Sequence, residues 1–153
     1  ESYMGPERAE SLVFRFNNEH ILLEHAEQRL FFGWGSWGRN RVYDSDTGRD
    51  LTVTDGHWII TLGVFGLVGF IAEFGLMAIA IFRAHSASKR IKSSNELTLL
   101  AGHALLVGIV MINQLPNSGL EAWLWLLIGG LLGRSEGILM QNRTRVTRQI
   151  YEK

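Results

Sequence analysis

Residues 31–69 read FFGWGSWGRNRVYDSDTGRDLTVTDGHWIITLGVFGLVG. The first half of this stretch is polar, is rich in glycine and tryptophan, and carries three arginines. The second half becomes an apolar run that is too long for the core helix of a soluble protein. Asp55 and His57 stand where the two halves meet. This pattern indicates a polar loop that ends at a membrane surface, next to a substrate that is part lipid and part polar.

Charge is strongly segregated along the chain, although the overall composition is ordinary. The chain has 153 residues, of which 46% are apolar and 20% are charged. Between residues 58 and 82 the only ionisable side chain is Glu73, which predicts a membrane span. The formal net charge is zero, so nothing favours a nucleic-acid partner, and the lack of cysteine excludes disulfides and thiolate metal sites. We interpret the chain, which starts at Glu1, as the C-terminal part of a longer membrane protein.

The hydropathy pattern predicts an all-α integral membrane protein with two parts. Residues 1–57 are expected to form an extracytoplasmic helix and loop, and residues 58–153 a membrane part that ends in a basic tail. Lysine and arginine are concentrated in the loop 83–96 and after residue 134, whereas the turn 114–119 has neither. The positive-inside rule therefore places residues 1–57 outside. The three expected spans are 58–82, 97–113 and 119–134.

Residues 8–29 show the periodicity of an amphipathic helix. We interpret this helix as lying on a protein or membrane surface, with His20 and His25 solvated. The apolar residues on its expected buried side are Leu12, Phe16, Leu22, Leu23, Ala26 and Leu30.

The segment 31–56 is expected to be irregular because its glycines interrupt any helix. Two short extended pieces, 41–43 and 51–53, are expected to pair around a turn at 44–48. Trp34 and Trp37 lie in this polar loop, where they either anchor and pack or stack on sugars. The sequence leaves both roles open.

Several motifs occur here in a characteristic order. Arg15 lies on the expected helix, Gly33 and Gly35 follow in Gly-Trp-Gly, and residues 54–69 enter the membrane as TDGHWIITLGVFGLVG. From about residue 11 to residue 70, this order and spacing resemble the C-terminal part of the O-antigen ligase and O-antigen polymerase family. Members of that family are multi-span enzymes of the bacterial inner membrane. The resemblance implies the same location, with residues 1–57 on the periplasmic side.

The glycines and Arg15 carry the resemblance. Arg15 falls on the family's helix arginine, and Gly33 and Gly35 fall on its glycine pair, although Leu30 stands where the family usually has proline. Gly66 and Gly69 match the motif that opens the following span.

The main departure from the family lies before that span. Counting back from Gly66, Asp55 falls on the family's histidine and Trp58 on its tyrosine, whereas His57 is two residues out of register. Either Asp55 replaces the histidine as the base, or His57 reaches the same space, or this branch has lost the reaction.

The resemblance implies a glycosyltransferase with a polyprenyl-diphosphate-linked glycan as donor and a glycan or lipid-linked acceptor, without a metal or another cofactor. Arginine meets the charge that develops on the diphosphate, and a base receives the proton of the acceptor hydroxyl. The expected catalytic residues are Arg15, Asp55 and His57. The expected substrate-binding residues are Arg15, Arg39, Arg41, Trp34, Trp37 and Trp58.

Four other interpretations stay open. Asp55 and Gly56 are also typical of a turn and helix cap. Glu73 and His103 are also consistent with a structural hydrogen bond between spans. The protein as a whole also suits a non-catalytic membrane scaffold or polysaccharide-export partner, or a transporter fragment.

Overall fold

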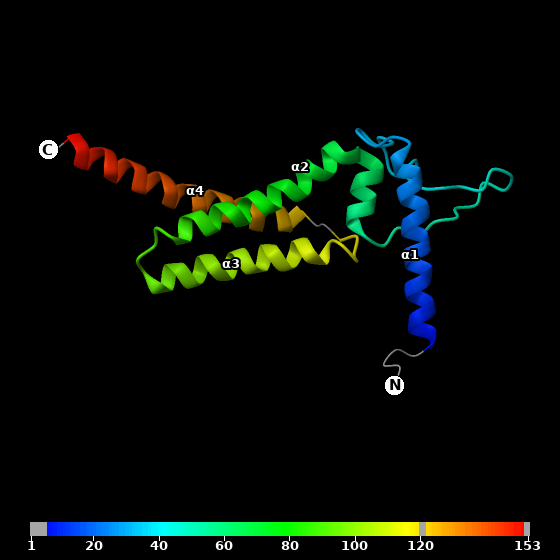
Figure 1. The fold of residues 1–153 in the computed structure, drawn as a ribbon, viewed down its shortest axis with the longest axis horizontal. Helices are drawn as coiled ribbons and strands as arrows, with labels where there is room; N and C mark the ends of the chain where they lie inside the picture. The colour runs from blue at the N-terminus through cyan, green and yellow to red at the C-terminus, as the bar shows by residue number, and fades with distance from the viewer. Residues whose placement is uncertain (1–5, 120–121, 152–153) are drawn as a thin grey trace. The chain divides into compact units, whose positions relative to one another are not determined.

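The computed structural model of the protein describes residues 6–119 and 122–151. Four helices account for most of these residues, and the described part contains no β-strand, which confirms the expected all-α class. The helices are α1 (Pro6–Glu27), α2 (His57–Ser88), α3 (Ser94–Asn113) and α4 (Ala122–Tyr151) (Figure 1). The chain forms two compact units, Glu1–Ala72 with Gln114–Gly119, and Glu73–Asn113 with Leu120–Lys153.

Two helices, α2 and α3, are long and apolar enough to cross a membrane. Only 22% of the most apolar window of α2 and 11% of that of α3 is buried, whereas a core helix of a soluble protein is mostly buried. Among the described residues α4 does not meet the same criterion. It starts at Ala122 and continues past Arg134, while residues 120–121 of the expected span 119–134 lie outside the described residues. A third span therefore stays a prediction.

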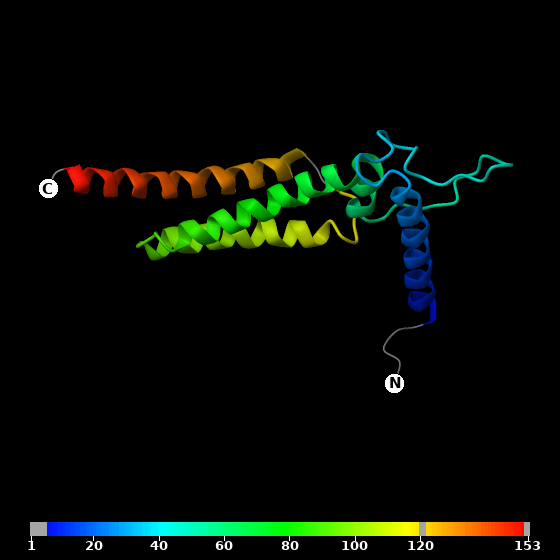
Figure 2. The same cartoon turned by 45° about the horizontal axis from the view of Figure 1, so that its top comes forward.

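The second unit is held together by an apolar core that α2, α3 and α4 share. Figure 2 shows α3 beside the C-terminal part of α2. Three alanines of α2 are almost completely buried, and small side chains of this kind let neighbouring helices approach closely. Arg83 of α2 also forms a two-pronged ion pair with Glu136 of α4, in which Nη2 donates to Oε2 over 2.7 Å. The buried core residues are Met77, Ala80, Ala84, Ala87, Leu100, Val107, Ile128, Leu131 and Leu139.

His103 connects α3 to α4 through a backbone carbonyl. Its Nε2 lies 2.8 Å from the carbonyl oxygen of Leu127, so the imidazole bonds to α4. The result agrees with a structural role for His103 between two helices.

In the first unit, α1 packs on the start of α2 through a smaller core of Leu22, Ala26, Ile59 and Leu62. Only the C-terminal part of the expected apolar side of α1 is buried here. Leu12 and Phe16 remain 40% and 67% exposed, so the periodicity of this helix extends beyond the surface that it packs against in the structure.

Helix α2 is interrupted at Gly66, whose φ of 68° and ψ of −166° are not helical. An interruption of this kind frees backbone groups that would otherwise bond along the helix. The segment 30–35 supplies their partners. Trp34 and Gly35 donate to the carbonyls of Gly63 and Val64, each over 2.8 Å. Leu67 and Val68 donate to the carbonyls of Leu30 and Phe31 over 2.7 and 3.2 Å.

The two motif glycines make this backbone crossing possible. A Cβ on Gly33 would lie 2.5 Å from the carbonyl of Val64, and one on Gly66 would lie 2.4 Å from the carbonyl of Phe31. Both positions also have positive φ, which glycine adopts without the steric cost of a side chain. The Gly-Trp-Gly loop is therefore fixed directly onto the break in α2.

The loop between α1 and α2 folds back on itself at residues 44–48, as expected. Tyr43 and Asp50 form an isolated antiparallel bridge, and the Leu51 N–H donates to the Val42 carbonyl over 2.9 Å. At the tip, the Asp44 carboxylate accepts hydrogen bonds from the backbone N–H and hydroxyl of Thr47 and from the N–H of Asp46. These bonds, with the Thr47 N–H first, lower the pKa of Asp44 below its ordinary value.

Candidate functional site

Arg15 and Asp55, which are far apart in the sequence, meet in the first unit. Arg15 Nε lies 3.4 Å from Asp55 Oδ2, and the two side chains are 52% and 39% exposed. An ion pair this exposed contributes only about 0–1 kcal/mol to stability. The contact uses Nε, which leaves the two terminal nitrogens of the guanidinium, the natural fork for a phosphate. An anionic ligand can therefore compete for Arg15 at little cost to the fold.

A buried asparagine brings the two residues together. Asn18, one turn after Arg15, is 6% exposed, and its Nδ2 donates to the Phe14 carbonyl over 2.9 Å. Its Oδ1 accepts the Val53 N–H over 3.0 Å. Because Val53 precedes Asp55 by two residues, this bond fixes the end of the outer loop against α1. Asn18 could not be identified from the sequence, since its partner lies 35 residues away.

His57 begins α2 and is placed by its backbone. Its N–H donates to the carbonyls of Gln114 and Asn117 over 3.0 and 2.9 Å, which fixes the start of the helix to the segment 114–119. The side chain is half-buried. Since α2 starts at His57, Gly56 occupies the cap position, and the Asp55 carboxylate contacts Arg15. Asp55 is thus the acidic group beside the guanidinium.

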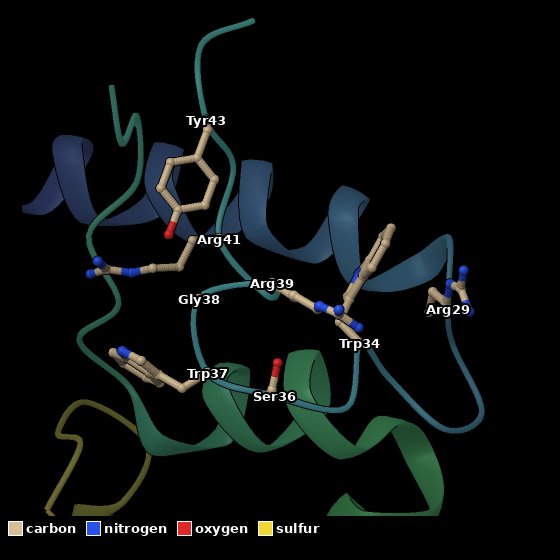
Figure 3. A pocket seen from close by; sticks show the side chains of 8 residues that line it. All are labelled: Arg29, Trp34, Ser36, Trp37, Gly38, Arg39, Arg41 and Tyr43. Carbon is tan, nitrogen blue, oxygen red and sulfur yellow. The ribbon is translucent and has the colours of Figure 1, made fainter. Parts of the chain in front are cut away.

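Arg39 and Arg41 line a different hollow from the Arg15–Asp55 pair. This hollow, which we call the tryptophan–arginine pocket, has a volume of about 640 Å³. Figure 3 shows the lining side chains, with Trp34 and Trp37 at opposite sides of the loop. Arg15 and Asp55 are not among its lining residues. The lining residues are Arg29, Trp34, Ser36, Trp37, Gly38, Arg39, Arg41 and Tyr43.

Trp34 is held rigidly from two sides. The His25 ring stacks on it, with centroids 4.4 Å apart and planes 1° from parallel, and the Trp34 Nε1 donates to the His25 carbonyl over 3.1 Å. The Arg29 guanidinium lies 5.1 Å from the indole centroid. The expectation that His25 is a solvated surface residue is therefore wrong, whereas His20 is exposed as expected and pairs with Glu24.

Arg41 is also positioned by two partners. Its Nη1 lies 2.5 Å from Asp50 Oδ2, and its guanidinium carbon lies 5.3 Å from the centroid of Trp37. Its Nε is buried and has no hydrogen-bond partner within the described part of the chain. Trp37 itself is 59% exposed, so one aromatic ring next to a fixed cation faces outward.

Trp58 and the motif glycines have structural positions. Trp58 is half-buried and packs against the core between α1 and α2, which leaves it outside the tryptophan–arginine pocket. Gly33, Gly35 and Gly66 form the backbone crossing, and Gly69 follows one turn later in α2. These residues hold the loop that carries the pocket.

Two residues that contact Trp34, the stacked His25 and the pocket-lining Arg29, were not identified from the sequence. They lie four residues apart at the end of the expected helix 8–29, hence on one face of it. That spacing, followed closely by a Gly-Trp-Gly sequence, is the signal that could have pointed to them.

Comparisons of this chain with protein-family models, curated proteins and solved structures give no match.

Proposed function

We propose that this protein is a membrane glycosyltransferase of the O-antigen ligase and polymerase type. It moves a glycan from a polyprenyl-diphosphate donor onto a sugar hydroxyl at the outer face of the bacterial inner membrane. The observation that carries the proposal is the exposed Arg15–Asp55 pair next to the start of an apolar helix. A cation for the diphosphate and a carboxylate for a proton stand together where such a substrate would enter.

The proposed reaction uses the weakness of this ion pair. The donor diphosphate takes the fork of Arg15, and Asp55 is released to face the acceptor. The acceptor oxygen bonds to the anomeric carbon while the bond from that carbon to the diphosphate oxygen breaks. The electron pair leaves with the diphosphate, whose charge Arg15 stabilises, and the hydroxyl proton passes to Asp55.

The tryptophan–arginine pocket supports glycan binding in the same unit. The exposed indole of Trp37 offers the flat apolar surface on which sugar rings stack, and the arginines supply hydrogen-bond donors to hydroxyl or carboxylate groups. The pocket does not supply the reacting groups in this proposal. It orients the glycan, and its residues affect KM more than kcat.

The first experiment tests the role of Arg15. Arg15→Lys keeps the charge but loses the planar fork, so glycan transfer should fall by about tenfold or more. The measurement is transfer from a polyprenyl-diphosphate-linked glycan in membranes at matched expression. Arg49→Lys is the matched control, because Arg49 is an exposed loop arginine, and it should keep full activity. Equal activity of the Arg15 variant and the control would contradict the proposed site.

The second experiment tests the proposed membrane orientation. Ser45→Cys in the exposed loop should react with an impermeant thiol reagent in intact cells. Ser94→Cys, exposed at the start of α3, should react only after the membrane is permeabilised. Reaction at Ser94→Cys in intact cells, with none at Ser45→Cys, would reverse the orientation and remove the donor from the Arg15 side.

A further inference from the structure

A hollow with an excess of positive charge lies in the second unit, between α4 and the connection from α2 to α3. Its volume is about 540 Å³. Among its lining side chains are three cations, one carboxylate, a hydroxyl and an amide. These polar side chains belong to Arg90, Lys92, Ser93, Glu96, Arg134 and Gln141. We call this hollow the basic pocket.

We propose that the basic pocket binds the phosphate headgroup of an anionic phospholipid. Arg90, Lys92 and Arg134 surround the hollow from two elements, and Glu96 offsets only one of the three charges. The proposal uses the membrane placement of the proposed function but none of its chemistry.

The cations of the pocket differ in how far they are already engaged. Arg90 Nη1 donates to the Leu139 carbonyl over 3.4 Å, which holds this guanidinium against α4. Lys92 and Arg134 are exposed and have no ion pair or hydrogen bond within the described residues. The neighbouring Arg83, by contrast, is neutralised by Glu136. Two uncompensated cations therefore point to an anionic ligand.

Apolar side chains that are exposed on the helices of the second unit favour a lipid over a soluble phosphate. Phe82 of α2, Leu99 of α3 and Met140 of α4 are 69%, 68% and 63% exposed, and all belong to the unit that contains the pocket. A ligand that carries a phosphate and acyl chains can satisfy both the cations and these apolar surfaces. Basic pockets between helices at a membrane surface bind lipid headgroups in this way.

The test compares lipid retention by native mass spectrometry. The full chain is purified in detergent with equal amounts of phosphatidylglycerol and phosphatidylcholine. The wild-type chain should retain phosphatidylglycerol preferentially. Lys92→Gln should reduce this preference about fivefold, and Lys92→Gln with Arg134→Gln should reduce it by more than about tenfold. Lys89→Gln is the matched control, because it removes one lysine charge from an exposed neighbour outside the pocket.

Three outcomes would overturn the inference. The first is equal retention of both lipids by the wild type, and the second is an equal loss of the preference in the Lys89 and Lys92 variants. The third is displacement of phosphatidylglycerol by millimolar inorganic phosphate, which would assign the pocket to a soluble anion. Circular dichroism of the helical signal identifies a variant that fails to fold. If the double variant fails to fold, Lys92→Gln is compared with Lys89→Gln alone, because Lys92 lies in a connection between helices. Lipid retention does not depend on glycan transfer, so this inference and the proposed function fail separately.

Discussion

Asp55→Asn should reduce glycan transfer by about 10²–10⁴-fold, the usual contribution of a general base. Asparagine keeps the size of the side chain and an oxygen that faces Arg15, but it cannot accept the proton of the acceptor hydroxyl. His57→Gln should reduce transfer by less than about tenfold, because in the structure it is Asp55 that contacts Arg15. The measurement is glycan transfer in membranes at matched expression.

Asp46→Asn is the control for this comparison. It makes the same chemical change in the same outer loop, at an exposed residue near the tip of the hairpin, and should leave transfer unchanged. A larger loss in His57→Gln than in Asp55→Asn would reassign the base to His57. Full activity in both would reduce the Arg15–Asp55 pair to a structural contact.

The second large effect is expected at the backbone crossing. Gly66→Ala should lower the free energy of unfolding by at least about 3 kcal/mol. Its backbone angles belong to a region that is essentially restricted to glycine, at a cost of about 1–3 kcal/mol for other residues. The new Cβ would also lie 2.4 Å from the Phe31 carbonyl, and each crossing hydrogen bond that is lost costs about 0.5–1.5 kcal/mol.

Thermal unfolding in detergent measures this effect. A loss of this size corresponds to a fall in Tm of roughly 6–12 °C for a chain of this length. Gly75→Ala is the matched control in the same helix, because a Cβ there meets nothing within 4 Å and alanine favours the helix by about 0.5–1 kcal/mol. Equal Tm values for the two variants would show that the crossing does not contribute to stability.

The crossing also marks what the sequence predicts and what it does not. Gly33 and Gly66 were recognisable because they fall on glycine positions of the family that this chain resembles. The long apolar run predicted α2. The segment 30–35 completes the hydrogen bonds of the broken helix through partners that lie 29 or 37 residues away in the sequence. No local sequence pattern contains such contacts. The helix periodicity and the turn at 44–48 were predictable because their determinants are local.

The candidate site divides in the same way. The resemblance implied that Arg15 and Asp55 belong to one catalytic site, and in the structure Arg15 Nε lies 3.4 Å from Asp55 Oδ2. The positions of His25 and Asn18 did not follow, because each is fixed by a partner from the outer loop. Periodicity also cannot say which part of an apolar face is covered, and so the exposure of Leu12 and Phe16 was not foreseen.

The sequence predicts a division of the chain at residue 57, between an extracytoplasmic part and a membrane part. This division stays a prediction. The compact units of the structure divide at Ala72 instead, because the start of α2 packs on α1 and receives the segment 30–35. This arrangement joins the outer loop to the first turns of the apolar helix. In the proposed function it keeps the loop at a fixed distance from the lipid part of the donor.

The most direct test of the central claim measures the fate of the donor. Proteoliposomes that contain the full-length protein are given a polyprenyl-diphosphate-linked glycan and an acceptor glycan, and both the lengthened acceptor and the free polyprenyl diphosphate are quantified. We predict that the two products appear in equal amounts and that both disappear in Asp55→Asn. Movement of intact donor or glycan across the membrane would support a transporter, and binding of the donor without either product would support a scaffold. Either result would contradict the proposed transfer reaction.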